Sequence, residues 1–367
     1  MNMSYSVHKY QPGDEEEIVN FLCETFKGWP HFDLECLPID HWRWKYVDNP
    51  PKLTVATLAK SEGRIVGCYF GLPQWLKIGD QKFLSCQGAD AATHPAYRGM
   101  GVYSKLRKYK FELMRGTATN FYYVVSMDSL LIEKNKREGR PALPFILEQL
   151  MKIRDIDLHL RKVSSERSFV KKYGYRALRT INWLKGSAKT SSKIRDDFKI
   201  TEVDRFDQSI DGFWSNVSTH YKLIVQRDGD YLNWRYCDLR GGKYNIRVAM
   251  ANGQILGYMV LRVNSYVPDY PTGYIVDLLT LPDRPDIVSE LGRHAVEFFD
   301  RRDVNIVQVN VLKNSLAELL FHGLGFVNYP VKPFMNYAAE YRNNYLDELN
   351  LRDVEKMHFS YGDYDWI

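Results

Sequence analysis

The stretch "HPAYRGMGVYSKL", residues 94–106, joins two different patterns in the chain. The apolar run before it predicts a strand. In residues 102–114, apolar residues recur at helical spacing among Lys and Arg, which predicts a helix. A loop at a helix N-terminus directs several backbone N–H groups and the positive end of the helix dipole to one point. Glycines at 99 and 101 let an anion approach that backbone closely. The stretch therefore predicts a strand, loop and helix that hold a phosphate group.

Other phosphate-binding loops fit these residues less well. A Walker loop needs Gly-Lys-Ser/Thr, which is missing, and "GMGVYS" lacks the third glycine of a dinucleotide fingerprint. The basic residues Arg98, Lys105, Arg107 and Lys108 favour an anionic ligand at the helix.

Around this stretch the first half of the sequence predicts a mixed sheet covered by helices. Strands are expected at residues 4–9, 53–60, 64–75, 82–93 and 120–127. Helices are expected from residue 13, with carboxylates in the first turn, and at residues 38–47 and 102–114.

The same organisation is repeated later in the chain. "HWRWKYVDNP" (residues 41–50) is echoed by "YLNWRYCDLR" (residues 231–240). Trp44 precedes Gly67 by 23 residues, and Trp234 precedes Gly257 by the same 23. "KKYGYRAL" (residues 171–178) and "FHGLGFVN" (residues 321–328) each predict a helix that ends near a glycine and leads into a strand. We interpret this repetition as a duplicated domain.

The repeat predicts an α/β (α+β) fold with two tandem domains, each a mixed central sheet flanked by helices. We expect a first domain at residues 1–186 with an inserted segment near 128–158, a polar linker at 187–197, a second domain at 198–336 and a C-terminal tail at 337–367. The end of the tail, "HFSYGDYDWI", is rich in aromatic residues, so it is expected to pack against the domains.

The strand meander that leads into "RGMGVY" and a basic amphipathic helix resembles motif A of the GNAT N-acyltransferases, Arg/Gln-x-x-Gly-x-Gly/Ala. Arg98, Gly101 and Tyr103 stand at its three specified positions, and Tyr103 departs from the pattern. The resemblance is specific around residues 93–106. It implies tandem GNAT-like domains and transfer of an acyl group, expected to be acetyl, from acetyl-CoA to the amine of a small molecule, with an amino sugar among the candidates.

The resemblance also implies which residues bind the coenzyme A thioester. They form the end of the strand, the loop and the first helical turn: Ala92, Thr93, Arg98, Gly99, Met100, Gly101, Val102, Tyr103 and Ser104. In the second copy, Pro282 and Pro285 remove N–H donors, and Asp283 and Asp286 repel phosphate. We therefore expect one acyl-CoA per chain, bound by the first half.

Acyl transfer needs a group that takes the proton of the amine. Asp90, flanked by small residues in "QGADAATHP", is the first candidate, and His94 is the second. The family's usual tyrosine acid is absent, which leaves Tyr122, Tyr123 and Tyr173 as alternatives. Strand alternation allows at most one of Tyr122 and Tyr123 to point into the site. The loop "GWPHFDLE" (residues 28–35) suggests an acceptor pocket, in which Trp29, His31 and Asp33 are expected to bind the substrate.

Composition limits the remaining classes of function. The five cysteines form no metal-ligand pattern, so neither a structural metal nor a disulfide framework is expected. No run of about 20 apolar residues and no signal peptide is present, which predicts a cytoplasmic protein with no membrane partner. The net charge of +5 is concentrated in the first half and suits a phosphorylated ligand. Nucleic acid is not expected as a partner, because no recognition signature is present. The oligomeric state stays open.

Two alternatives to an acetyltransferase remain. A FemABX-like aminoacyl transferase also doubles this fold, although the glycine loop counts against it. The departure at Tyr103 and the absent tyrosine acid leave room for a non-catalytic acyl-CoA sensor or scaffold.

Overall fold

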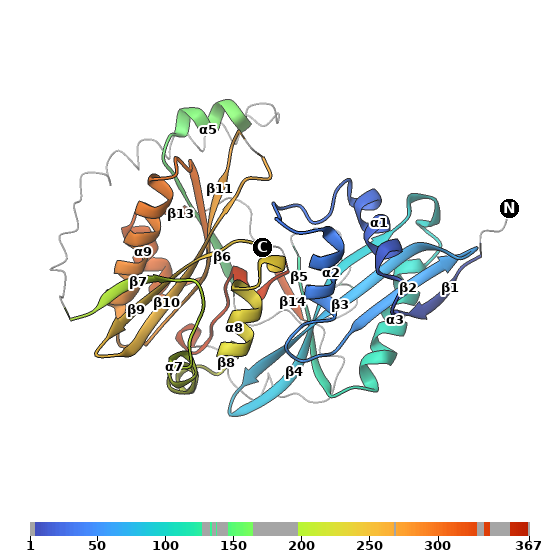
Figure 1. Cartoon of the computed structure of the whole chain (residues 1–367), viewed down its shortest axis with the longest axis horizontal. Coiled ribbons are helices and arrows are strands. Elements are labelled where there is room, and N and C mark those ends of the chain that lie inside the picture. Colours follow the sequence, from blue (N-terminus) through green and yellow to red (C-terminus); the bar gives the residue numbers. More distant parts are fainter. Residues whose placement is uncertain are drawn as a thin grey trace.

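The computed structural model of the chain describes residues 4–126, 133, 137, 146–163, 197–267, 269–328, 334–337 and 353–365. Within these residues the chain forms two seven-stranded mixed sheets that lie side by side (Figure 1). Residues 171–178, most of the predicted linker and most of the tail fall outside this part of the chain.

The first sheet has the strand order β1-β2-β3-β4-β5-β14, and β8 pairs with the end of β3. Its strands are β1 (Ser6–Lys9), β2 (Val55–Ser61), β3 (Arg64–Ile78), β4 (Gln81–Thr93), β5 (Thr119–Ser126), β8 (Leu223–Val225) and β14 (Phe334–Tyr337). Helices α1 (Glu15–Phe26) and α2 (Pro38–Tyr46) pack on one face, and α3 (Val102–Arg115) packs on the other. The predicted order of strands and helices is confirmed from β1 to β5.

The second sheet repeats this plan in the order β13-β6-β12-β11-β10-β9-β7. Its strands are β6 (Leu147–Ile153), β7 (Lys199–Val203), β9 (Asn245–Ala251), β10 (Gln254–Asn264), β11 (Thr272–Thr280), β12 (Ile306–Leu312) and β13 (Val327–Asn328). The helices are α5 (Ile156–Val163), α7 (Ser209–Val217), α8 (Gly229–Tyr236), α9 (Pro285–Asp300) and α10 (Leu316–Gly323). In both sheets a parallel pair, β4–β5 or β11–β12, follows an antiparallel meander, so the tandem architecture is confirmed.

The two sheets exchange strands across the predicted domain boundary. β6 comes from the segment that we predicted as an insertion in the first domain, yet it lies between β12 and β13 of the second sheet. β14 comes from the end of the second half and pairs with β5 of the first sheet. Residues 147–153, which we predicted to belong to the first domain, therefore join the sheet of the second.

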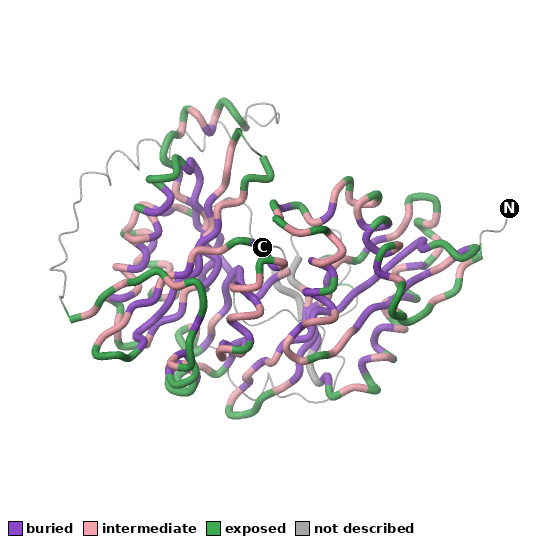
Figure 2. The backbone as a smooth tube through the Cα atoms, in the orientation of Figure 1, coloured by how far each residue is buried: buried purple, intermediate pink, exposed green. Residues whose placement is uncertain are grey.

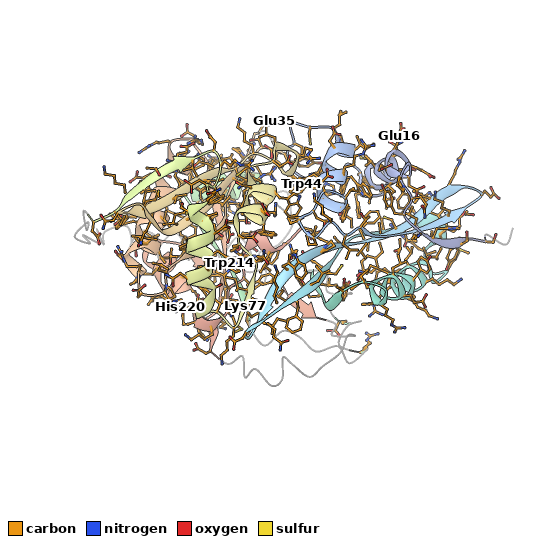
Figure 3. The ribbon with its side chains drawn as sticks, turned by 60° about the horizontal axis from the view of Figure 1, so that its bottom comes forward. Glu16, Glu35, Trp44, Lys77, Trp214 and His220 are labelled. Atoms are coloured by element: carbon orange, nitrogen blue, oxygen red, sulfur yellow. The ribbon has the colours of Figure 1, made fainter. Side chains whose placement is uncertain are left out.

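The repeated tryptophans meet where the halves touch. Trp44 of α2 and Trp234 of α8 stack with ring centroids 4.8 Å apart, and Figure 3 shows Trp44 between the halves. The indole N–H of Trp44 donates to the Trp234 carbonyl oxygen at 2.9 Å, and the Trp234 indole returns the bond to Trp44 at 3.2 Å. Equivalent residues that contact each other reciprocally indicate a pseudo-twofold relation between the halves.

The C-terminal tail is part of the core, as expected from its aromatic residues. Phe359, Tyr361 and Tyr364 are buried in one apolar cluster with residues of both halves, among them Leu76 and Tyr258. Figure 2 shows the buried backbone running through the region where the halves meet. The tail therefore stabilises the contact between them.

Candidate active site

The loop before α3 exposes its backbone for an anion. Gly99 and Gly101 have φ angles of 81° and 76°, a region that favours glycine. A Cβ atom at either position would meet nothing within 4 Å, so the space in front of the loop is open among the described residues. The first bond of the helix runs from the Lys105 N–H to the Gly101 carbonyl oxygen. The N–H groups of the three residues 102–104 thus precede the helical ladder and suit phosphate oxygens.

The departure at Tyr103 has a structural reason. The Tyr103 ring lies 5.4 Å from the Tyr69 ring on β3, and the two side chains form a hydrogen bond. Tyr103 also packs in the apolar cluster between α3 and the first sheet. Its side chain therefore points toward the sheet, and the motif tolerates a large residue here because the sheet accommodates it.

Strand β4 separates from β5 next to this loop. The two parallel strands pair only from Leu84 to Gln87 on the β4 side, and the rest of β4 pairs with β3 alone. The β3–β4 register shifts around Asp90, whose φ angle is 40°. A bulge leaves backbone groups unpaired and redirects a side chain. The separated strands and the start of α3 thus form one open end of the sheet, with Ala92 and Thr93 on its β4 side.

Asp90 belongs to a buried cluster of charges. Its Oδ2 atom accepts hydrogen bonds from Lys45 Nζ at 3.0 Å and from the Tyr46 hydroxyl. Lys45 Nζ also contacts Asp365 Oδ2 at 3.4 Å, and Gln87 Nε2 donates to Asp365 Oδ1 at 3.3 Å. One lysine of α2 therefore joins a carboxylate of β4 to a carboxylate of the tail.

The two carboxylates differ in their affinity for a proton. Burial acts to raise the pKa of Asp90, but the Lys45 charge and hydrogen bonds from Tyr46, Lys45 and Trp29 outweigh it, so this pKa lies below its usual value. Burial and the neighbouring Asp90 charge raise the pKa of Asp365, and Lys45 only partly offsets them. Asp365 is therefore the better proton acceptor of the pair.

Sequence reasoning identified Asp90 but missed Lys45, Tyr46 and Asp365. A signal for the first two was present, because "WKY" (residues 44–46) and "WRY" (residues 234–236) match in the repeat. Nothing in the sequence showed that the tail reaches this cluster.

The other candidate catalytic residues lie elsewhere. His94 is half-buried on a short turn, where its Nδ1 accepts a bond from the Ala96 N–H at 3.2 Å. Tyr122 lies under α3, where its hydroxyl meets that of Tyr69. Tyr123 points to the opposite face and donates to Gln74 Oε1 at 2.5 Å. The predicted opposite orientation of the two tyrosines is confirmed.

The predicted acceptor loop lies at the contact between the halves. Trp29 is buried, and Lys45 Nζ lies 6.0 Å from the centroid of its ring. Asp33 binds Arg262 of β10, whose Nη2 donates to the Asp33 carbonyl oxygen at 2.7 Å and to its carboxylate at 3.3 Å. The His31 ring packs edge-on against Tyr266 at 5.9 Å. Trp29 is thus next to the charge cluster, whereas Asp33 and His31 connect the halves.

The second half keeps a similar carboxylate without the glycine loop. Asp277 Oδ2 of β11 accepts from the Tyr236 hydroxyl at 3.1 Å, as Asp90 does from Tyr46. Arg227 binds both Asp277, at 3.1 Å, and Asp363 of the tail, at 2.9 Å. The tail thus supplies one carboxylate to the buried cation of each half.

The described residues show neither a metal-binding cluster nor a membrane-spanning helix. They contain no group of three or more His, Cys, Asp or Glu side chains that could hold a metal ion. None of their helices is long and apolar enough to cross a membrane.

Comparison with known proteins agrees with this architecture. Residues 6–129 match the family model described as an acetyltransferase (GNAT) domain. No curated protein sequence matches the chain significantly.

Solved structures share the fold over most of the chain. A conserved protein of unknown function from Enterococcus faecalis V583, titled a probable N-acyltransferase, is 13% identical with a TM-score of 0.61, covering 91% of this chain and 72% of that one. N-myristoyltransferase of Saccharomyces cerevisiae with bound myristoyl-CoA is 11% identical with a TM-score of 0.60, covering 94% and 84%. The same enzyme with myristoyl-CoA and inhibitors gives a TM-score of 0.63 at 11% identity, covering 94% and 82%. Residues 6–129 thus match a GNAT acetyltransferase domain, and the chain as a whole shares the fold of these solved structures.

Proposed function

We propose that the chain is an acyl-CoA-dependent N-acyltransferase that acts on the amine of a small molecule. The observation that carries this proposal is the open loop of Gly99 and Gly101 at the start of α3, next to the point where β4 leaves β5. The residues present fit a coenzyme A thioester, because unpaired backbone N–H groups and the nearby Arg98 complement its phosphates. The bound thioester would supply the activated acyl group.

The residues of the chain would prepare the amine for reaction. An amine attacks only after losing a proton, and Asp365 is the group that we assign as the acceptor of that proton. Asp90 is assigned a positioning role, because its carboxylate already binds Lys45 and Tyr46. Lys45 would hold Asp365 in place and stabilise its charged form.

Acetyl is our first choice for the acyl group, and the amino sugar is our first choice for the acceptor. The myristoyl-CoA bound to the similar yeast enzyme makes a longer acyl chain the alternative for the donor. We also propose a reducing compartment such as the cytoplasm, which the five free thiols support.

The experiment is a measurement of thiol release from acetyl-, octanoyl- and myristoyl-CoA with a panel of amines that includes amino sugars. We expect release that depends on an amine and yields the amide by mass spectrometry. Binding of these thioesters without turnover for any amine would refute the enzyme and favour the acyl-CoA sensor. Absence of binding would refute both.

A further inference from the structure

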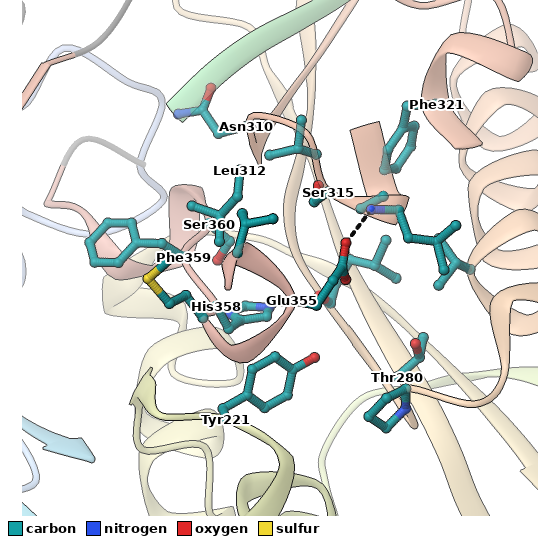
Figure 4. A pocket seen from close by; sticks show the side chains of 18 of the residues that line it. Tyr221, Thr280, Asn310, Leu312, Ser315, Phe321, Glu355, His358, Phe359 and Ser360 are labelled. Carbon is teal, nitrogen blue, oxygen red and sulfur yellow. Dashed lines mark hydrogen bonds between the residues drawn. The ribbon is translucent and has the colours of Figure 1, made fainter. Parts of the chain in front are cut away.

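The second half contains a cavity of about 480 Å³, a volume typical of small-molecule sites. It opens where β11 and β12 separate, since the two strands pair only from Thr272–Ile275 to Ile306–Val309. Its walls come from β11, β12, the starts of α9 and α10, and the tail (Figure 4). The cavity thus occupies the position in the second sheet that the open end of β4 and β5 occupies in the first.

The start of α9 makes this cavity unsuitable for a phosphorylated ligand. Pro282 and Pro285 line it and carry no N–H donor. Asp286 adds a carboxylate to the first helical turn and binds Arg284 at 2.7 Å, while Arg284 also contacts Asp197 at 3.4 Å. The cation at this rim is therefore already paired with carboxylates.

The inner wall carries two hydrogen-bond acceptors that lack partners among the described residues. Asn310 is 4% exposed; its Nδ2 donates to the Tyr364 hydroxyl at 3.2 Å, and its Oδ1 has no partner. His358 Nε2 lies 2.9 Å from the Leu278 carbonyl oxygen and must therefore donate to it, which leaves Nδ1 as an acceptor without a partner. Burial and the nearby Arg227 lower the pKa of His358, which keeps the ring neutral.

The rest of the wall is mostly apolar. Leu278, Val309, Val311, Leu312 and Phe321 line the cavity, together with Met357 of the tail. Glu355 adds a carboxylate, whose Oε1 accepts from the Leu316 N–H at 2.7 Å. A ligand that satisfies these groups has an apolar body and a hydrogen-bond-donating head.

We propose that this cavity is a second ligand site that binds a primary amine carrying an apolar group. The amine donates to Asn310 Oδ1 and His358 Nδ1, and its apolar body packs against Val309, Val311 and Phe321. A carboxylate or phosphate fits less well, because both unpartnered groups are acceptors and the carboxylates of Glu355 and Asp277 offset the charge of Lys356 in the lining. This site is separate from the loop of the first half and stands whether or not the chain transfers acyl groups.

The test is a calorimetric titration of the full chain with octylamine, octanoate and octanol as probes. We expect octylamine to bind at least tenfold more tightly than octanoate, and binding of coenzyme A to be unaffected. Octanol measures how much the apolar body contributes, and equal affinity for octanol and octylamine would overturn the assignment of an amine.

Two variants test whether octylamine binds in this cavity. Ala317→Trp on α10 puts a large ring into the cavity wall and should weaken octylamine binding at least tenfold, whereas Leu319→Trp on the same helix is the control, since Leu319 is 67% exposed. Asn310→Leu removes one acceptor and should reduce the preference for octylamine over octanol. Unchanged binding in Ala317→Trp, or no binding of octylamine to the unmodified chain, would overturn the proposal. An unchanged circular dichroism spectrum and thermal unfolding transition show that each variant is folded.

Discussion

The carboxylates of Asp90 and Asp365 share one lysine, yet they are suited to different roles. Asp90 is placed by a bulge in β4, and its hydrogen bonds keep it ionised. Asp365 lies on the tail, is 10% exposed at its side chain, and holds a proton more readily. Lys45 thus bridges two carboxylates, of which Asp365 is suited to exchange a proton and Asp90 is not.

Replacing Asp365 with Asn should lower kcat at least tenfold with little change in KM for the thioester, because an amide accepts no proton. The acid limb of the pH profile of kcat should disappear with it. Steady-state kinetics from pH 5 to 9 test this, and Asp353→Asn, at an exposed tail position, is the matched control. An unchanged acid limb in Asp365→Asn would remove this residue from the reaction.

His41 makes the contact between the halves sensitive to acid. Burial and the charge of Lys45 lower its pKa to about 3, while its Nδ1 bonds to the Arg240 carbonyl oxygen at 2.7 Å. A histidine in the unfolded chain has a pKa of about 6.5, so between these values the unfolded chain binds more protons. Between pH 6.5 and the folded pKa of about 3, the free energy of unfolding should therefore fall by about 1.4 kcal/mol for each unit by which the pH decreases.

The measurement is urea unfolding of the unmodified chain and of His41→Asn at pH 7, 6, 5 and 4. The stability difference between the two proteins should shrink as the pH falls, because the variant lacks this proton uptake. A constant difference across the series would show that His41 does not carry the acid sensitivity.

At the scale of elements, the loop and first turn of α3 were predictable from the sequence because glycine spacing and helical periodicity are local properties. The exchange of β6 and β14 was not predictable, because an apolar strand such as Leu147–Ile153 pairs equally well with the edge of either sheet.

Gly101→Asp should weaken coenzyme A binding at least tenfold, since it forces a side chain into a left-handed backbone and sets a carboxylate against the phosphates. Gly253→Asp is the matched control, because Gly253 has the same φ angle of 76° and open space around it in the turn between β9 and β10 of the second sheet. Thermal shift with coenzyme A compares them. Equal losses in both variants would attribute the effect to general destabilisation.

At the scale of the whole molecule, the two halves act as one unit. Each sheet contains a strand from the other half, and the tail contributes Asp363 and Asp365 to the buried cations of both. The repeat in the sequence predicted two similar domains, and the equivalence of Trp44 and Trp234 was visible there. Their stacking was not, because sequence similarity does not state which surfaces of two copies meet.

Trp44→Ala should lower the free energy of unfolding by about 3–5 kcal/mol, as expected for a buried tryptophan. Both halves should still unfold in a single transition, because the exchanged strands remain. Denaturant unfolding, monitored by circular dichroism, tests this. Trp214→Ala is the control, because Trp214 is partly exposed. Two separate transitions in the unmodified chain would contradict the interdependence of the halves.

The central claim is that the first half alone holds a coenzyme A thioester at the start of α3. Calorimetric titration of the full chain with coenzyme A and acetyl-CoA tests it most directly. We predict one molecule bound per chain, with binding weakened at least tenfold in Gly101→Asp and retained in Gly253→Asp. No binding, or two molecules per chain with the second unaffected by Gly101→Asp, would contradict the claim.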